Sequence, residues 1–112
     1  MTEIPRIQRL SDRQGQQERK AKLAQRLFER GDQLMREALQ AQPVQQASII
    51  RAIDCFHQAI EARPDLEAPY LALAYISWRL GRSADALALL NTVQAQRLYS
   101  ARAEALRLRI QT

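Results

Sequence analysis

Residues that break regular structure are scarce in this chain, and their scarcity most constrains its fold. Of its 112 residues, only 3 are glycine and 4 are proline, and long stretches contain neither. Strands need a turn every few residues, and turns are built from these residue types. The sequence therefore predicts an all-α protein.

The segment from about residue 16 to 41 has the apolar spacing of one helical face. Apolar residues recur every three or four positions over four turns, as the buried face of a helix requires. Gly31 lies within this face, and we expect it to let another helix approach closely, because an exposed glycine in a helix costs about 1 kcal/mol relative to alanine. Pro43 ends the helix, since proline cannot continue one. The apolar face comprises Ala24, Leu27, Phe28, Leu34, Met35, Ala38 and Leu39.

Four shorter helices are expected after Pro43. Pro64 stops the first of them, and Asp65 is available to cap the next. Gly81 supplies a helix stop, and Ser83 supplies the cap that follows it. The expected helices cover about 45–62, 66–80, 84–96 and 100–110.

These elements predict about five helices in a single domain, because a chain of this length allows one domain. Residues 1–15 are polar and basic, and we expect them to form an N-terminal tail. The domain then covers residues 16–112 as a stack of antiparallel helix hairpins. One hairpin is expected over 16–63 and a second over 66–97, with a last helix over 100–111.

Two of the expected helices resemble each other at a separation of about 34 residues. At this shift Ala52 aligns with Ala86, and Phe56 aligns with Leu90. A period of this length with Ala-x3-Phe in the second helix resembles the tetratricopeptide repeat. Residues 52–64 match the second helix of that family closely.

The helix expected after Pro64 resembles the first helix of the next repeat. Tyr70, Ala74 and Ser77 replace the Trp, Gly and Tyr that are usual in the family, and Leu73 and Gly81 stand at the family's spacing. The resemblance implies a solenoid of helix hairpins in which the last helix caps the stack, since an uncapped repeat exposes its apolar face.

Upstream, the 34-residue shift fails because it places Ser77 on Pro43. A longer shift, which aligns Ala74 with Gly31, works better. We therefore expect an extended first hairpin, and the resemblance covers about residues 24–98.

In this family the first helices of the repeats line a concave groove, so the resemblance implies a groove that binds a peptide or a helix of another protein. Aromatic and methionine side chains there would supply contact area. Trp78 has an alternative place, packed beneath a later helix. The positions carried over from the family are Phe28, Asp32, Met35, Arg36, Leu71, Tyr75, Trp78 and Arg79.

The resemblance implies an adaptor, a chaperone or an assembly subunit, as in the small bacterial chaperones of this family. Some members grip a terminal carboxylate with Lys and Asn on successive first helices. Leu71 and Tyr75 stand at the matching positions here, so we expect an apolar groove without that clamp.

The chain is basic, with a net charge of +5, and nine of its 17 basic residues fall between Arg6 and Arg36. A basic segment favours acidic partners, and nucleic acid binding is the alternative function that it predicts. The other interpretation is a solvated helix face. The candidate basic patch comprises Arg13, Arg19, Lys20, Lys22, Arg26 and Arg30.

Motifs of catalysis are not found in the sequence. His57 is the single histidine, and Cys55 lies two residues before it. Because side chains advance by about 100° per residue around a helix, these two diverge, so the pair makes no metal site. No phosphate loop or metalloprotease motif occurs. We therefore expect no enzyme activity, no metal and no cofactor.

No run of about 18 apolar residues and no signal-like start occurs, so we expect a cytoplasmic protein without a transmembrane segment. The two expected repeats are fewer than the roughly three that such stacks need for stability. A homodimer, or a place in a larger complex, is therefore a further expectation.

Overall fold

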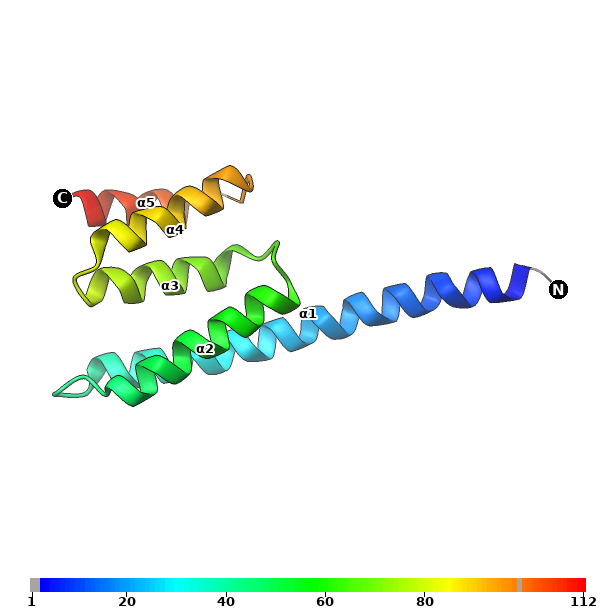
Figure 1. The fold of residues 1–112 in the computed structure, drawn as a ribbon, viewed down its shortest axis with the longest axis horizontal. Coiled ribbons are helices and arrows are strands. Elements are labelled where there is room, and N and C mark those ends of the chain that lie inside the picture. The colour runs from blue at the N-terminus through cyan, green and yellow to red at the C-terminus, as the bar shows by residue number, and fades with distance from the viewer. Residues whose placement is uncertain (1–2, 99) are drawn as a thin grey trace.

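The computed structural model is an all-α stack of helix hairpins, as the sequence predicts (Figure 1). It describes the backbone of residues 3–98 and 100–112, and the side chains of residues 13–98 and 100–112. Within these residues there are five helices and no strand. They are α1 (Glu3–Gln40), α2 (Gln46–Ala62), α3 (Glu67–Arg79), α4 (Ser83–Ala95) and α5 (Ala101–Gln111).

The first helix is longer than expected. It begins at Glu3, so the expected tail over residues 1–15 is corrected: residues 3–15 are the first part of α1, and residues 1–2 lie outside the described residues. Single weak helix formers such as Gly15 cost only about 1 kcal/mol each, and Pro5 falls in the first turn, where its missing N–H is tolerated. Figure 1 shows α1 projecting well beyond the other helices.

The first hairpin is built on the close approach of α1 and α2 at Gly31. A Cβ atom at Gly31 would lie 2.8 Å from Cε1 and 3.0 Å from Cδ1 of Phe56. The Phe56 ring is fully buried, and its centroid lies 5.8 Å from that of Phe28. The structure thus confirms that Gly31 permits close approach, and it identifies the group that fills the space.

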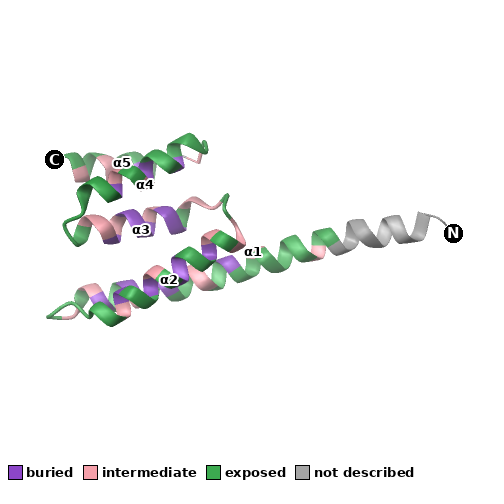
Figure 2. Cartoon of the chain, in the orientation of Figure 1, coloured by how far each residue is buried: buried purple, intermediate pink, exposed green. Residues whose placement is uncertain are grey.

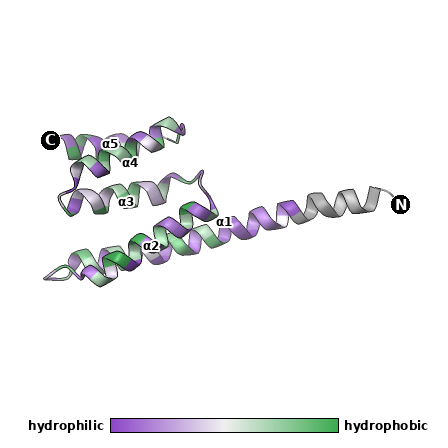
Figure 3. Cartoon of the chain, viewed as in Figure 1, coloured by the Kyte–Doolittle hydropathy of each residue, from purple (hydrophilic) through white to green (hydrophobic). Residues whose placement is uncertain are grey.

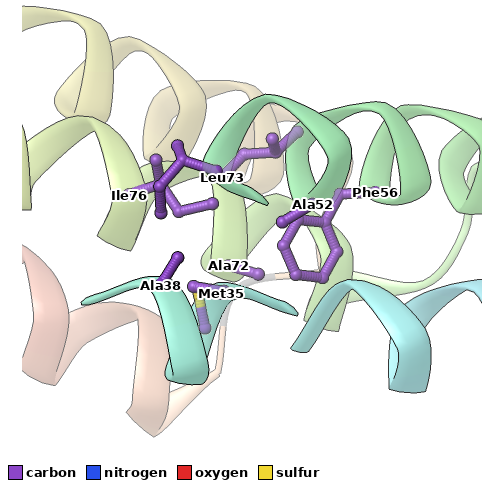
Figure 4. Close-up of a cluster of buried hydrophobic side chains, with 8 residues drawn as sticks. Met35, Ala38, Ala52, Phe56, Ala72, Leu73 and Ile76 are labelled. Carbon is purple, nitrogen blue, oxygen red and sulfur yellow. The ribbon is translucent and has the colours of Figure 1, made fainter. Parts of the chain in front are cut away.

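Helix α3 joins the two hairpins because it contributes to both cores. Ala72, Leu73 and Ile76 pack with residues of α1 and α2, as Figure 4 shows. Ala74 packs instead with residues of α4 and α5. Each of the five helices has buried residues. Figure 2 shows them concentrated where the helices face one another. The second core comprises Ala74, Ala86, Leu90 and Ala103.

Two of the expected helix caps are wrong. The N-cap residue, which directly precedes the helix, is Leu66 for α3 and Arg82 for α4, and neither makes a side-chain cap hydrogen bond. Ser83 is already the first residue of α4, one position too late to cap it. Asp65 lies too early to cap α3, and Arg63 binds its carboxylate instead.

The Arg63 guanidinium donates two hydrogen bonds to Asp65, of 2.8 Å from Nε and 2.7 Å from Nη2. These hydrogen bonds hold the pKa of the Asp65 carboxyl below its ordinary value. The same pairing raises the pKa of Arg63. The α2–α3 turn is therefore closed by a bidentate ion pair.

The cap of α5 is formed by Ser100. Its Oγ accepts from the backbone N–H groups of Arg102 at 3.2 Å and Ala103 at 3.4 Å. The same hydroxyl donates to Oε1 of Glu67, at 2.6 Å, on the first residue of α3. One side chain thus starts α5 and ties it to α3. No helix within the described residues is long and apolar enough to cross a membrane.

Candidate functional site

A hollow of about 260 Å³ lies where α1, α3 and α5 meet. Side chains spaced three and four residues apart share one face of a helix, which brings these positions together. Five of the eight groove residues predicted from the sequence line this hollow. They are Phe28, Asp32 and Met35 of α1 and Leu71 and Tyr75 of α3.

A second hollow, of about 490 Å³, adjoins the first because Met35 and Tyr75 line both. It adds Arg36 and Arg79, two further residues predicted from the sequence. We call the two hollows together the groove. Seven of the eight predicted residues therefore line one continuous surface between α1, α3 and α5.

Trp78 does not line the groove. Its ring is partly buried against the second core, below α5. The guanidinium carbon of Arg109 lies 4.8 Å from the centroid of this ring, and the Tyr75 ring lies 5.9 Å away at an angle of 62°. Trp78 is thus packed beneath a later helix, which was the alternative place for it. Its edge-on contact with the Tyr75 ring helps to hold Tyr75 in the groove.

The sequence reasoning missed the contribution of α5, whose Arg102 and Leu106 line the groove. The missed signal is the repeat itself: these residues follow Ala68 and Ala72, which also line the groove, by the same period of about 34 residues. Helix α5 therefore does more than cover the end of the stack, because it forms one wall of the groove.

Arginine side chains in the groove are held by short hydrogen bonds. Nε of Arg36 donates to Oδ2 of Asp32 at 2.9 Å, and the Arg36 side chain is 71% exposed. Nη1 of Arg79 donates to the Tyr75 hydroxyl at 2.8 Å, and its guanidinium lies 5.7 Å from the Tyr75 ring centroid. The groove therefore combines an apolar floor with a basic rim.

The predicted basic patch divides between faces of α1. Because side chains advance by about 100° per residue, four of its members form one stripe on the side opposite Gly31. All four are exposed, and Figure 3 shows the hydrophilic character of this part of α1. Lys20 instead faces Arg63 and Asp65, and Arg13 shares the side of Lys20. The stripe comprises Arg19, Lys22, Arg26 and Arg30.

A separate apolar hollow, of about 410 Å³, lies between α2 and the α3–α4 turn. Ile50 is 66% exposed there, beside Val44 and Leu80. The sequence reasoning missed this hollow, although Ile50 follows the buried Ile49 directly and adjacent helical positions cannot both face the core.

Within the described residues, no group of three or more His, Cys, Asp or Glu side chains is placed to hold a metal ion. Cys55 is a buried free thiol, and His57 is exposed. No protein-family model matches the chain, and no curated protein and no solved structure matches it either.

Proposed function

We propose that this chain is a non-enzymatic adaptor, chaperone or assembly subunit of the tetratricopeptide-repeat type, which holds a peptide or helix of another protein in its groove. One observation carries the proposal. Seven side chains chosen from their positions in the sequence, on two separate helices, line adjoining hollows. Residues that only fill a core have no reason to share an open surface.

The chemistry of the groove suits this function. Phe28, Leu71 and Tyr75 are partly exposed, so a bound segment would remove their apolar surface from water. Met35 lines both hollows but is only 8% exposed, so it belongs to the floor of the groove. Large aromatic and apolar side chains of this kind dominate the energy of protein interfaces.

Site-specific photocrosslinking in cells that make the protein tests the proposal. A photoreactive residue in place of Arg79, at the edge of the groove, is expected to form adducts with a defined partner. The same residue in place of His57, which is exposed on α2, is the control and is expected to form none of these adducts. Adding Leu71→Glu should abolish the Arg79 adducts. Equal adducts from both positions, or adducts insensitive to Leu71→Glu, would contradict the proposal.

The stripe on α1 favours a second candidate function, the binding of nucleic acid. Arg19, Lys22, Arg26 and Arg30 are aligned and exposed, and no ion pair within the described residues neutralises them. If all four contact phosphates, the logarithm of the binding constant should fall with the logarithm of salt concentration with a slope of about −3 to −4. Titrating mixed-sequence DNA and RNA at several salt concentrations measures this slope.

The control for the second candidate exploits exposed arginines elsewhere. Changing Arg26 and Arg30 to Gln should weaken binding and reduce the slope by about 2. Changing Arg51 and Arg82 to Gln removes the same charge away from the stripe and should leave the slope unchanged. Binding that does not respond to salt rules this function out.

The proposal includes a cytoplasmic location and assembly into a homodimer or a larger complex. The projecting part of α1 in Figure 1 offers a surface for such assembly. Light scattering on the purified chain, with fractionation of the cells that make it, tests both points. A monomer recovered free of other proteins would contradict the assembly.

A further inference from the structure

The groove is lined by more positive than negative charge. Its two hollows hold the side chains of Arg36, Arg79 and Arg102, and Asp32 is the one carboxylate among their lining residues in the described part of the chain. A bound segment would therefore meet an apolar floor with cations beside it.

One of these guanidinium groups is held by an aromatic ring and not by a carboxylate. Arg79 lies 5.7 Å from the Tyr75 ring centroid and donates to its hydroxyl at 2.8 Å. An aromatic contact orients a guanidinium without neutralising its charge. Arg79 is thus preorganised to receive a carboxylate, which reduces the entropy lost on binding.

Arg36 has a carboxylate partner but keeps most of its binding capacity. Its bond to Asp32 uses Nε, and guanidinium offers five N–H donors in all. An exposed pair four residues apart on a helix contributes only about 0.3–0.5 kcal/mol. A carboxylate from a partner can therefore add to this pair or displace it at little cost.

Resting on the groove function proposed above, we propose that the bound partner is an acidic amphipathic segment. Its large apolar side chains pack on Phe28, Met35 and Leu71, and its Asp or Glu side chains pair with Arg36 and Arg79. Carboxylates form strong, frequently bidentate hydrogen bonds with arginine. Charge complementarity of this kind speeds association and excludes basic partners, because like charges in an interface cost several kcal/mol.

The alternative occupants fit the groove less well. A second copy of the chain carries a net charge of +5, because its 17 basic residues outnumber its 12 acidic ones, so it is not the acidic partner that these arginines favour. Nucleic acid needs a continuous track of cations along its phosphates. Here the cations flank side chains such as Met35 and Leu71, which cannot hydrogen-bond to bases.

Selection from a phage library of random peptides of about 16 residues, with the full chain as bait, tests the proposal. The selected peptides are expected to be enriched in Asp and Glu and in large apolar residues. Their affinities are then measured by fluorescence anisotropy. Arg36→Glu combined with Arg79→Glu should weaken binding about tenfold or more. Arg51→Glu with Arg82→Glu changes the net charge equally, and screening at a distance should keep its effect below about twofold.

The outcomes separate this inference from the function on which it rests. Neutral or basic peptides that lose binding to Leu71→Glu would overturn the acidic partner and leave the groove function standing. If no selected peptide depends on Leu71, the groove function itself fails. Equal losses in the two charge variants, displacement of the peptide by mixed-sequence RNA, or a homodimer that the peptide dissociates would each overturn the inference. Circular dichroism of each variant confirms that the helices remain intact.

Discussion

Gly31 leaves a space that the ring of Phe56 fills, so its missing side chain is a packing requirement of the first hairpin. Gly31→Ala would place a methyl group 2.8 Å from a fully buried ring. Overpacking of this kind lowers the free energy of unfolding by about 1–3 kcal/mol, whereas the higher helix propensity of alanine raises it by about 1 kcal/mol. We expect the free energy of unfolding to fall by up to about 2 kcal/mol in urea denaturation.

Gly15 provides the matched control, since it lies in the same helix without a packed neighbour. A Cβ atom there would meet only Nη1 of Arg19, at 3.7 Å, which is an ordinary contact. Gly15→Ala should therefore raise the free energy of unfolding by about 0.5–1 kcal/mol, or leave it unchanged if the end of α1 unfolds separately. Destabilisation by both changes to the same extent would contradict the role assigned to Gly31.

The Arg63–Asp65 pair predicts a titration that NMR can measure directly. The hydrogen bond from Arg63 lowers the pKa of Asp65 below its ordinary value of 3.8. A carboxyl whose folded pKa is lowered stabilises the fold above its unfolded pKa and loses that contribution as the pH falls through the folded value. We expect the Asp65 carboxyl carbon to titrate below 3.8, and Arg63→Gln to return it to that value. An unchanged titration in Arg63→Gln would exclude this cause.

Sequence reasoning succeeded for Gly31 and failed for Asp65 for a physical reason. The burial of Gly31 follows from its place in a helical period, which is a local property. The role of Asp65 depends on whether the chain starts a helix one residue earlier or later, and helix boundaries are set by competing contacts of similar energy. The Asp65 carboxylate pairs with the Arg63 guanidinium, which donates two hydrogen bonds to it, and does not cap the helix.

At the scale of the element, α5 depends on one hydroxyl. Ser100→Ala removes the cap of α5 and also the bond to Glu67. Loss of a cap costs about 0.5–2 kcal/mol. We expect the amide protons of α5 to exchange faster with solvent, as measured by hydrogen exchange with NMR detection.

Ser83→Ala is the natural comparison for Ser100→Ala, because Ser83 also precedes a run of apolar residues but makes no cap hydrogen bond. It should leave exchange in α4 nearly unchanged. Because α5 places Arg102 and Leu106 in the groove, Ser100→Ala should also weaken any ligand held there. Equal effects of the two changes would argue against the cap.

The helices were predictable because each has an apolar period, and because Pro43, Pro64 and Gly81 lie just beyond the ends of α1, α2 and α3. The part of α1 before Gln16 was not, because Ser11, Asp12 and Gly15 are weak helix formers that indicate an interruption. The place of α5 in the groove was missed for a different reason. It depends on how the hairpins stack, and the sequence reasoning treated α5 only as a cover for the last repeat.

At the scale of the whole molecule, the chain is elongated. Its principal extents are 63, 29 and 17 Å, and its radius of gyration is 17.3 Å. A compact domain of this length would have a radius of gyration of about 13 Å. Small-angle X-ray scattering on the monomeric chain should give a radius of gyration near 17 Å. The pair-distance distribution should have a tail beyond about 50 Å, because the helix α1 is about that long. A value near 13 Å would show that α1 does not project.

Because α1 is one continuous helix, it sets a fixed spacing. With a rise of about 1.5 Å per residue, Arg19 on the stripe stands about 24 Å along the axis from Met35 in the groove. The two positions also face in different directions around that axis. A partner bound at the stripe and a partner bound in the groove would therefore be held at a fixed separation and a fixed relative orientation by α1.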